Sequence, residues 1–193
     1  MDKKIKLAET VFLVDTAYLN FMLVNLKGFL ENQVNRKLSD ISMADLFTYL
    51  ALDAGLKEGE KVIQIILVAD DSSSRIKFAI PSDLKKDLDG VAFDSSLGEF
   101  AFASAFTEGM VSREDLFLDI LNIVTESKDV KELIVLSFDD EYGGKVFEKL
   151  NDKDLDKTVT QFRMREPEKE VNYKWDMLVF PLMKAFGIEG SEI

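Results

Sequence analysis

The chain has 193 residues, 47% of them hydrophobic, and its 24 basic and 36 acidic residues give a formal net charge of −12. It contains no histidine and no cysteine, which excludes catalytic Ser-His-Asp and Cys-His groups, disulfide bonds and the common zinc sites. The negative charge opposes broad, non-specific binding to nucleic acid. The remaining carboxylate oxygens suit Mg²⁺ or Mn²⁺ as ligands.

The length and the presence of only three prolines predict one folded domain that spans residues 1–193. No apolar run approaches the roughly 18 residues of a membrane-spanning helix, and the N-terminus lacks the hydrophobic region of a secretory signal. We therefore expect no membrane association and a cytoplasmic location.

Apolar runs alternate with segments of helical periodicity along the chain. Ser42 and Ser112 are predicted to cap the helices that follow them, and Gly55 to end the first of those two helices. In chain order, the predicted elements are a strand at 10–15, a helix from 16 to about 37, a helix at 43–55, strands at 61–70 and 75–80, a polar helical turn or loop at 81–90, a strand or edge hairpin at 99–106, a helix at 112–127, a strand at 132–137, a helix at 138–150, a strand at 158–164, and a final helix at 175–187 kinked at Pro181.

The alternation of strands and helices predicts an α/β fold, a three-layer α/β/α sandwich around a mostly parallel central sheet. The first strand is apolar throughout, which is typical of a central strand buried on both faces. We expect the segments 75–80 and 99–106 to form an antiparallel addition at one edge of this sheet.

Acidic residues follow three of the strongest predicted strands. Ligands of open α/β sheets bind outside the carboxyl ends of the strands, so these acids mark a candidate site. Aspartate is also a favoured N-cap, and for Asp15 alone the cap interpretation is preferred. Three adjacent acids repel each other unless a cation or solvent relieves them, so the third group favours a ligand more strongly. The three groups are Asp15, then Asp70 with Asp71, then Asp139 with Asp140 and Glu141.

Two consecutive glycines follow the third acidic group, in the first part of the predicted helix at 138–150. Each costs a helix about 1 kcal/mol relative to alanine, so a reason for their presence is expected. Gly143 and Gly144 could allow a close approach of the backbone to a ligand, or could relieve crowding against a neighbouring strand.

The segment VFLVDTAY at 11–18 resembles the opening strand and first acid of NYN-type PIN-like nuclease domains. The segment LSFDDEYGGKVFEKL at 136–150 is similar to the later strand and Ser-x-Asp-x-Asp-Phe turn of that family. In this register Ser137, Asp139, Glu141 and Tyr142 take the Ser, Asp, Asp and Phe positions. The family also has an acid-bearing helix before the later strand, and the corresponding segment 114–119 offers Asp115 and, as the less favoured choice, Asp119.

The resemblance implies a PIN-like sandwich whose acids bind Mg²⁺ or Mn²⁺ and hydrolyse phosphodiester bonds, commonly of RNA, within a metal-lined pocket. It makes Asp15 and Asp139 the main metal ligands, and Glu141 and Asp115 outer or second ligands. Ser137 would orient the site as a hydrogen-bond donor. Such chemistry needs no histidine, because the bound ion activates water and stabilises the charge of the transition state.

Two functions remain open from the sequence. One is a metal-dependent ribonuclease, in which the carboxyl groups of Asp15, Asp115 and Asp139 converge on one cation. The other is a catalytically inactive PIN-like domain that binds a protein partner or forms a homodimer through the Phe-rich segment 99–106, since an exposed apolar edge strand is a template for pairing. The phenylalanines of this segment could equally belong to the core, and the core interpretation is preferred.

Overall fold

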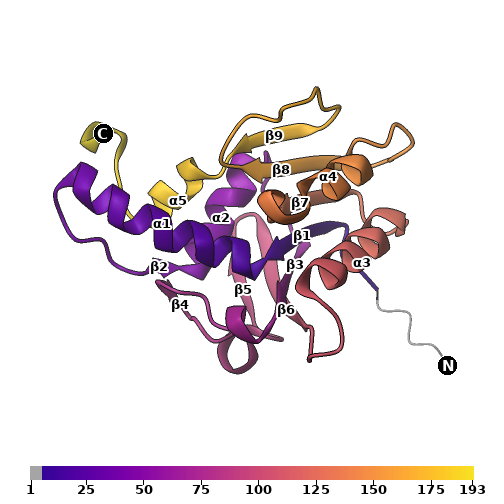
Figure 1. The fold of residues 1–193 in the computed structure, drawn as a ribbon, viewed down its shortest axis with the longest axis horizontal. Helices are drawn as coiled ribbons and strands as arrows, with labels where there is room; N and C mark the ends of the chain where they lie inside the picture. Colours follow the sequence, from indigo (N-terminus) through magenta and orange to yellow (C-terminus); the bar gives the residue numbers. More distant parts are fainter. Residues whose placement is uncertain (1–5) are drawn as a thin grey trace.

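A seven-stranded sheet forms the centre of the computed structural model (Figure 1). The structure describes residues 6–193, and residues 1–5 of the predicted domain lie outside the described part. The strand order of the sheet is β5-β6-β3-β1-β7-β8-β9, and all neighbouring pairs are parallel except β5 with β6. The strands are β1 (Thr10–Asp15), β3 (Val62–Ala69), β5 (Ala92–Ser95), β6 (Gly98–Phe106), β7 (Glu132–Leu136), β8 (Thr158–Arg163) and β9 (Lys174–Met177).

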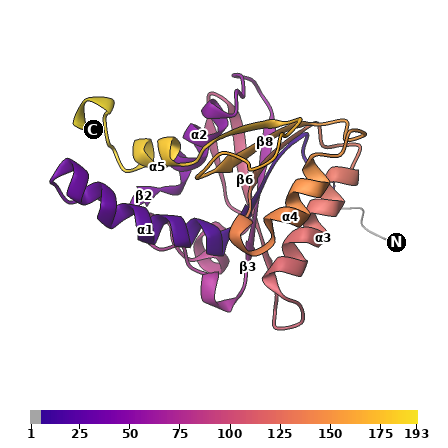
Figure 2. The same ribbon diagram turned by 45° about the horizontal axis from the view of Figure 1, so that its top comes forward.

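Helices cover both faces of the sheet, which confirms the predicted three-layer α/β/α architecture (Figure 2). One face carries α1 (Thr16–Val34), α2 (Met43–Asp53) and α5 (Val179–Ala185), and the other carries α3 (Arg113–Glu126) and α4 (Asp139–Leu150). Each face of the sheet has its own hydrophobic core: the first lies under α1, α2 and α5, and the second under α3 and α4. Along β1, Phe12 and Val14 point into the first core, whereas Val11 and Leu13 point into the second. The central position predicted for this apolar strand is therefore confirmed.

The remaining elements are short. They are the two-residue strands β2 (Ile41–Ser42) and β4 (Ala79–Ile80), the π-helical turn η2 (Leu84–Leu88), and the 3₁₀ turns η1 (Asp71–Ser73) and η3 (Gly190–Glu192). Within residues 6–193, no helix combines the length and the apolar character needed to cross a membrane.

The strand order reverses between β1 and β7, which are neighbours in the sheet. The chain runs from β1 through β3 to β6 on one side of the sheet, and then from β7 through β8 to β9 on the other. The helices that leave β1 and β7, α1 and α4, consequently pack on opposite faces. A topological switch point of this kind is where ligands of open α/β sheets bind.

The predicted antiparallel addition exists, and the predicted strand at 99–106 belongs to it as β6, but its antiparallel partner is not the segment 75–80. Strand β6 pairs in parallel with β3, and the antiparallel strand is β5, which lies outside β6. In the segment 75–80 only β4 is a strand, and it pairs in parallel with β2 in a separate two-stranded sheet. The prediction for 75–80 was wrong because tertiary pairing, rather than the local alternation of side chains, selects which short segments become strands.

The segment 99–106 is not an exposed edge. It pairs with β3 along its whole length and with β5 over residues 98–101, and Phe100 and Phe102 are buried in the core on the α1 side of the sheet. The core interpretation of these phenylalanines is confirmed. The outer strands of the seven-stranded sheet are β5 and β9, which are its edges for pairing with a second chain.

The predicted final helix at 175–187 was also wrong in its first part. Residues 174–177 form β9, which pairs in parallel with β8, and α5 begins only at Val179. Pro181 lies in the first turn of α5, where backbone N–H groups have no helical partner, so it causes no kink. Pairing with β8 overrides the helical periodicity of this segment.

Candidate functional site

Asp15 is a helix cap and also the buried centre of a polar cluster. One carboxylate oxygen accepts hydrogen bonds from the backbone amides of Ala17 at 2.9 Å and Tyr18 at 3.2 Å, which caps α1. The carboxylate also accepts from the Tyr142 hydroxyl and from Arg113 Nε, the latter at 3.0 Å. Its side chain is fully buried. An ionised carboxylate offers about four acceptor sites, and Asp15 has four donors.

Arg113, the first residue of α3, joins three acids that come from three different strand ends. Its Nε meets Asp15, one terminal nitrogen meets Asp70 at 3.1 Å, and the other meets Glu141. The side chain is only 13% exposed. Although burial opposes it, the charge of Asp15, followed by the other two carboxylates, raises the pKa of Arg113 above its ordinary value. The guanidinium thus provides the positive charge that the acidic cluster requires.

Asp70 is held by the turn that follows β3. Its carboxylate caps η1, accepting from the Ser73 backbone amide at 3.0 Å and from the Ser72 hydroxyl at 2.7 Å. Burial alone would raise the pKa of Asp70, but hydrogen bonds from Ser72, Ser73 and Arg113 outweigh burial and lower it to about 2. Asp70 therefore stays ionised opposite Arg113.

Tyr142 contacts the Asp15 carboxylate from the protein interior. It lies at a kink in α4, where its backbone angles leave the helical region, and its side chain is 3% exposed. Burial and then the charge of Asp15 raise the pKa of Tyr142 well above the ordinary value. The hydroxyl consequently keeps its proton and donates a hydrogen bond to Asp15.

Asp139 is the first residue of α4, just after β7, and it forms hydrogen bonds with a separate set of side chains. It accepts from Ser137 Oγ at 2.6 Å and from Gln161 Nε2 at 3.2 and 3.3 Å, and Arg163 Nε lies 3.4 Å away. Burial, which outweighs the Ser137 hydrogen bond, raises the pKa of Asp139. Asp15 and Asp139 therefore belong to two different polar networks.

The predicted ligands do not converge as one group. Arg113 brings Glu141 together with Asp15, whereas Ser137 and Asp139 lie in the second network. Asp115 is exposed on α3, where its backbone amide binds the capping Ser112 hydroxyl at 3.0 Å. In the part of the chain that the structure describes, no group of three or more acidic side chains is arranged to hold a metal ion.

Sequence reasoning missed the basic residues of both networks. Arg113 had one local signal, since a cation in the first turn of a helix opposes the helix dipole and needs a compensating anion. Gln161 and Arg163 had none, because they belong to an ordinary alternating strand, β8. Only the pairing of β8 with β7 brings them to Asp139.

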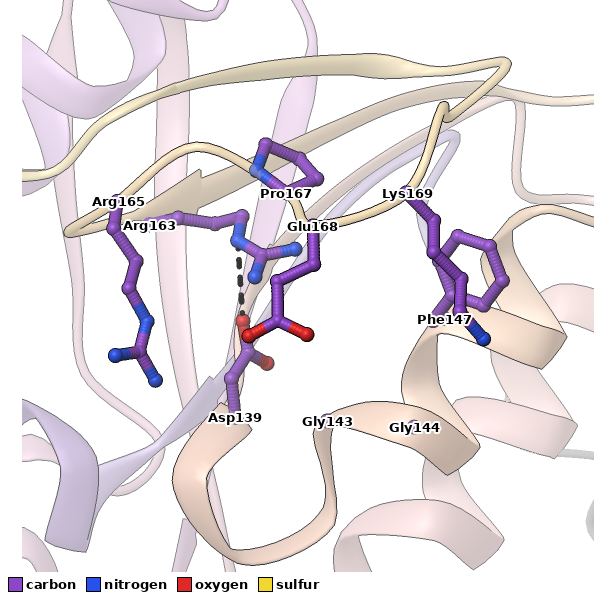
Figure 3. Close-up of a pocket in the computed structure, with 9 residues that line it drawn as sticks. All are labelled: Asp139, Gly143, Gly144, Phe147, Arg163, Arg165, Pro167, Glu168 and Lys169. Atoms are coloured by element: carbon purple, nitrogen blue, oxygen red, sulfur yellow. Dashed lines mark ion pairs between the residues drawn. The ribbon is translucent and has the colours of Figure 1, made fainter.

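A cavity of about 220 Å³ opens beside Asp139, between the start of α4 and the loop that follows β8 (Figure 3). Arg163 and Glu168 point toward Asp139, whereas Lys169 lies against the ring of Phe147. The two glycines of α4 form the opposite wall.

The two glycines have different surroundings. A Cβ atom on Gly143 would lie 2.9 Å from the Cβ of Asp139, so this glycine makes room for the Asp139 side chain one turn earlier. A Cβ on Gly144 would have no neighbour within 4 Å. The crowding at Gly143 comes from its own helix rather than from a neighbouring strand, and sterics do not explain Gly144.

Comparison with known families gives one match. A profile of DUF6621, a family of unknown function, matches residues 4–193. The comparisons with curated proteins and with solved structures gave no match.

Proposed function

The chain belongs to DUF6621, a family of unknown function, and we propose that it acts as a non-catalytic binding domain whose strand-end acids are neutralised by an arginine instead of a divalent cation. The observation that carries this proposal is the contact of Arg113 with Asp15, Asp70 and Glu141. These acids follow β1, β3 and β7 at the carboxyl edge of the sheet.

The hydrogen bonds of Asp15 support the proposal. All of its roughly four acceptor sites have donors, so a metal ion could bind only by displacing one of them. The guanidinium cannot leave as a neutral group, because arginine is not deprotonated in proteins. Its departure would separate buried charges, which is strongly unfavourable.

The competing hypothesis is the metal-dependent ribonuclease, with Asp15, Asp139, Glu141 and Asp115 as ligands of Mg²⁺ or Mn²⁺. It requires Arg113 to move out of the cluster and Asp139 to turn from Ser137 and Gln161 toward Asp15. The two hypotheses therefore differ in whether added Mn²⁺ stabilises the protein.

The test measures the melting temperature in Mn²⁺ and in EDTA, together with cleavage of an RNA oligomer, for the parent, Asp139→Asn and Asp119→Asn. Asp119 is an exposed acid of α3 and serves as the matched control. We expect equal melting temperatures of the parent in both solutions, and equal background cleavage by all three proteins.

A Mn²⁺-dependent rise in melting temperature, lost together with RNA cleavage in Asp139→Asn but kept in Asp119→Asn, would overturn the proposal. That result would establish the catalytic alternative, in which Arg113 moves aside when the cation binds.

A further inference from the structure

Two neighbouring cavities at the carboxyl edge of the sheet share the residues Asp139, Arg163 and Arg165. The first, of about 220 Å³, lies against α4 and contains Lys169, and the second, of about 210 Å³, lies against α1. Together they extend across the switch point between β1 and β7, where the two helices diverge. Neither cavity contains Arg113, so they are separate from the cluster around Asp15.

Arg163 is only loosely held by its carboxylate neighbour. Its Nε lies 3.4 Å from Asp139 without hydrogen-bond geometry, and this buried atom has no hydrogen-bond partner among the described residues. Asp139 does not depend on Arg163, because Ser137 and Gln161 already donate to both of its oxygens. The unmatched donor leaves the Arg163 guanidinium, whose side chain is 15% exposed, incompletely paired, which favours an additional anion close by.

Two further cations at these cavities are free to turn toward an anion. Arg165 pairs with Asp140 at 2.5 Å, but both side chains are mostly exposed, and such surface pairs contribute little. Lys169 makes no salt bridge within residues 6–193 and lies over the ring of Phe147 at 5.5 Å. The seven residues 163–169 hold these three cations and two acids, Glu166 and Glu168, so this segment keeps a small positive charge in a protein with a net charge of −12.

Acids also line the cavities, and their positions limit where an anion can bind. Asp140 is paired with Arg165, and Glu168, on the loop after β8, points toward Asp139 beside Arg163, so an anion at Arg163 has to displace this exposed carboxylate (Figure 3). Asp139 accepts hydrogen bonds from Ser137 and Gln161, which partly offset its charge toward an anion near Arg163. The wall at Gly144 is open, since a Cβ atom there would meet no other atom within 4 Å, and an anion can approach the cations from this side.

The second cavity is mostly apolar and aromatic on the side of α1. Tyr18 and Met22 are buried there, while Phe21 is 48% exposed and contacts Phe138 at 5.4 Å between ring centroids. An aromatic ring exposed beside arginines is a platform on which a flat ring can stack, as bases do on aromatic side chains.

We infer that the two cavities form one binding site for a mononucleotide, with its phosphate at Arg163, Arg165 and Lys169 and its base against Phe21. The cation-lined and aromatic halves adjoin through the shared residues, so one ligand can reach both. This inference rests on the proposed binding function and gives it a ligand class. The two proposals fail separately, because the cavities do not include Arg113.

The test titrates the common ribonucleoside monophosphates, the matching nucleosides and inorganic phosphate into the full chain in EDTA at low salt, with calorimetry as the readout. The charge variant is Arg165→Gln with Lys169→Gln, which alters two exposed side chains. Its matched control is Arg36→Gln with Lys37→Gln, an exposed pair with the same loss of charge elsewhere on the surface. Phe21→Ala tests the aromatic half.

We expect the monophosphates to bind more tightly than the nucleosides and than inorganic phosphate. The charge variant should weaken this binding at least about tenfold, and Phe21→Ala by a few-fold, while the control pair leaves it unchanged. The absence of nucleotide binding by the parent, or an equal loss in the control pair, would overturn the inference. So would a single-stranded RNA oligomer that binds far more tightly than any monophosphate, since that would identify a nucleic acid as the ligand.

Discussion

Two acidic networks lie side by side at the carboxyl edge of the sheet, and they differ in how completely their charges are matched. Around Asp15, four donors fill the carboxylate and one guanidinium contacts three acids. Around Asp139, the nearby Arg163 is held at 3.4 Å with a buried donor unsatisfied, and a cavity opens beside it. We call the first network closed, because the Asp15 carboxylate has all its hydrogen-bond donors, and the second open, because it has an unsatisfied donor and adjoins a cavity.

The difference shows that an acid at a strand end does not by itself identify a ligand site. The decisive factor is the cation that another part of the chain brings to it. Arg113, on α3, neutralises the acids of the first network. Arg163, on β8, lies near Asp139 in the second network without forming a hydrogen bond to it through Nε. Binding is therefore expected at the network whose charges are less well satisfied.

The largest expected effect comes from removing the cation of the closed network. Arg113→Met should lower the free energy of unfolding by roughly 3–5 kcal/mol, because it leaves the fully buried Asp15 without its counter-charge. Urea denaturation measures this loss. The control Arg36→Met removes an exposed pair with Glu192 and should cost less than about 1 kcal/mol. Equal losses would show that the first network is not closed in solution.

The next effect tests the hydroxyl that seals the buried side of this network. Tyr142→Phe should cost roughly 1.5–3 kcal/mol of unfolding free energy, since it removes a hydrogen bond to the Asp15 carboxylate. Tyr49→Phe, at a half-buried tyrosine of α2 for which no hydrogen bond is seen within residues 6–193, should change stability by less than about 0.5 kcal/mol. A neutral Tyr142→Phe variant would contradict the described geometry.

Acid titration distinguishes the contribution of Asp70. The pKa of Asp70 falls from an ordinary 3.8 to about 2 on folding. Its ionised carboxylate therefore stabilises the fold fully at pH values above 3.8, and this stabilisation is lost as the pH falls through about 2. Asp70→Asn should therefore cost roughly 1–2 kcal/mol at neutral pH, and this difference from the parent should vanish near pH 2. Chemical denaturation across this range measures the difference.

The control for this titration is Asp71→Asn, an exposed neighbour that makes no salt bridge within the described residues. It should change the free energy of unfolding at neutral pH by less than about 0.5 kcal/mol. A stability difference between Asp70→Asn and the parent that persists at low pH would show that the effect of Asp70 does not arise from its ionised form.

The smallest effects compare the two glycines at the open network. Gly144→Ala should raise the free energy of unfolding by roughly 0.5–1 kcal/mol, because the added methyl group meets no atom and alanine favours the helix. Gly143→Ala should lower it by about 1 kcal/mol or more, since its Cβ would lie 2.9 Å from that of Asp139. Thermal unfolding of the pair gives both signs, and a stabilising Gly143→Ala would mean that Asp139 is free to move away.

Much of the fold could be predicted because its strongest elements carry local signals. The apolar run of β1, the serine caps of α2 and α3, and the helix after β7 all lie where the sequence places them. The weak segments were decided by pairing instead. Residues 174–177 became a strand because β8 offered an unpaired edge, and β5 became the antiparallel edge strand through its hairpin with β6.

The candidate site could be predicted only in part. The sequence indicated that acids would gather at one edge, and parallel pairing does align the ends of β1, β3 and β7 there. It could not indicate that Asp15 and Asp139 would separate into two networks, because their partners are distant along the chain. Arg113 lies 98 residues from Asp15, and Gln161 lies 22 residues from Asp139.

The sequence by itself determined the layered α/β class, the helix caps and the acids at the strand ends, since each of these depends on neighbouring residues and on periodicity. Only the tertiary structure decided which cations meet those acids, because charge pairing depends on distance in space rather than along the chain. That pairing makes Asp15 a buried helix cap whose carboxylate accepts four hydrogen bonds. It also left Arg163 as the residue with an unsatisfied donor, at the side of the switch point that remains open.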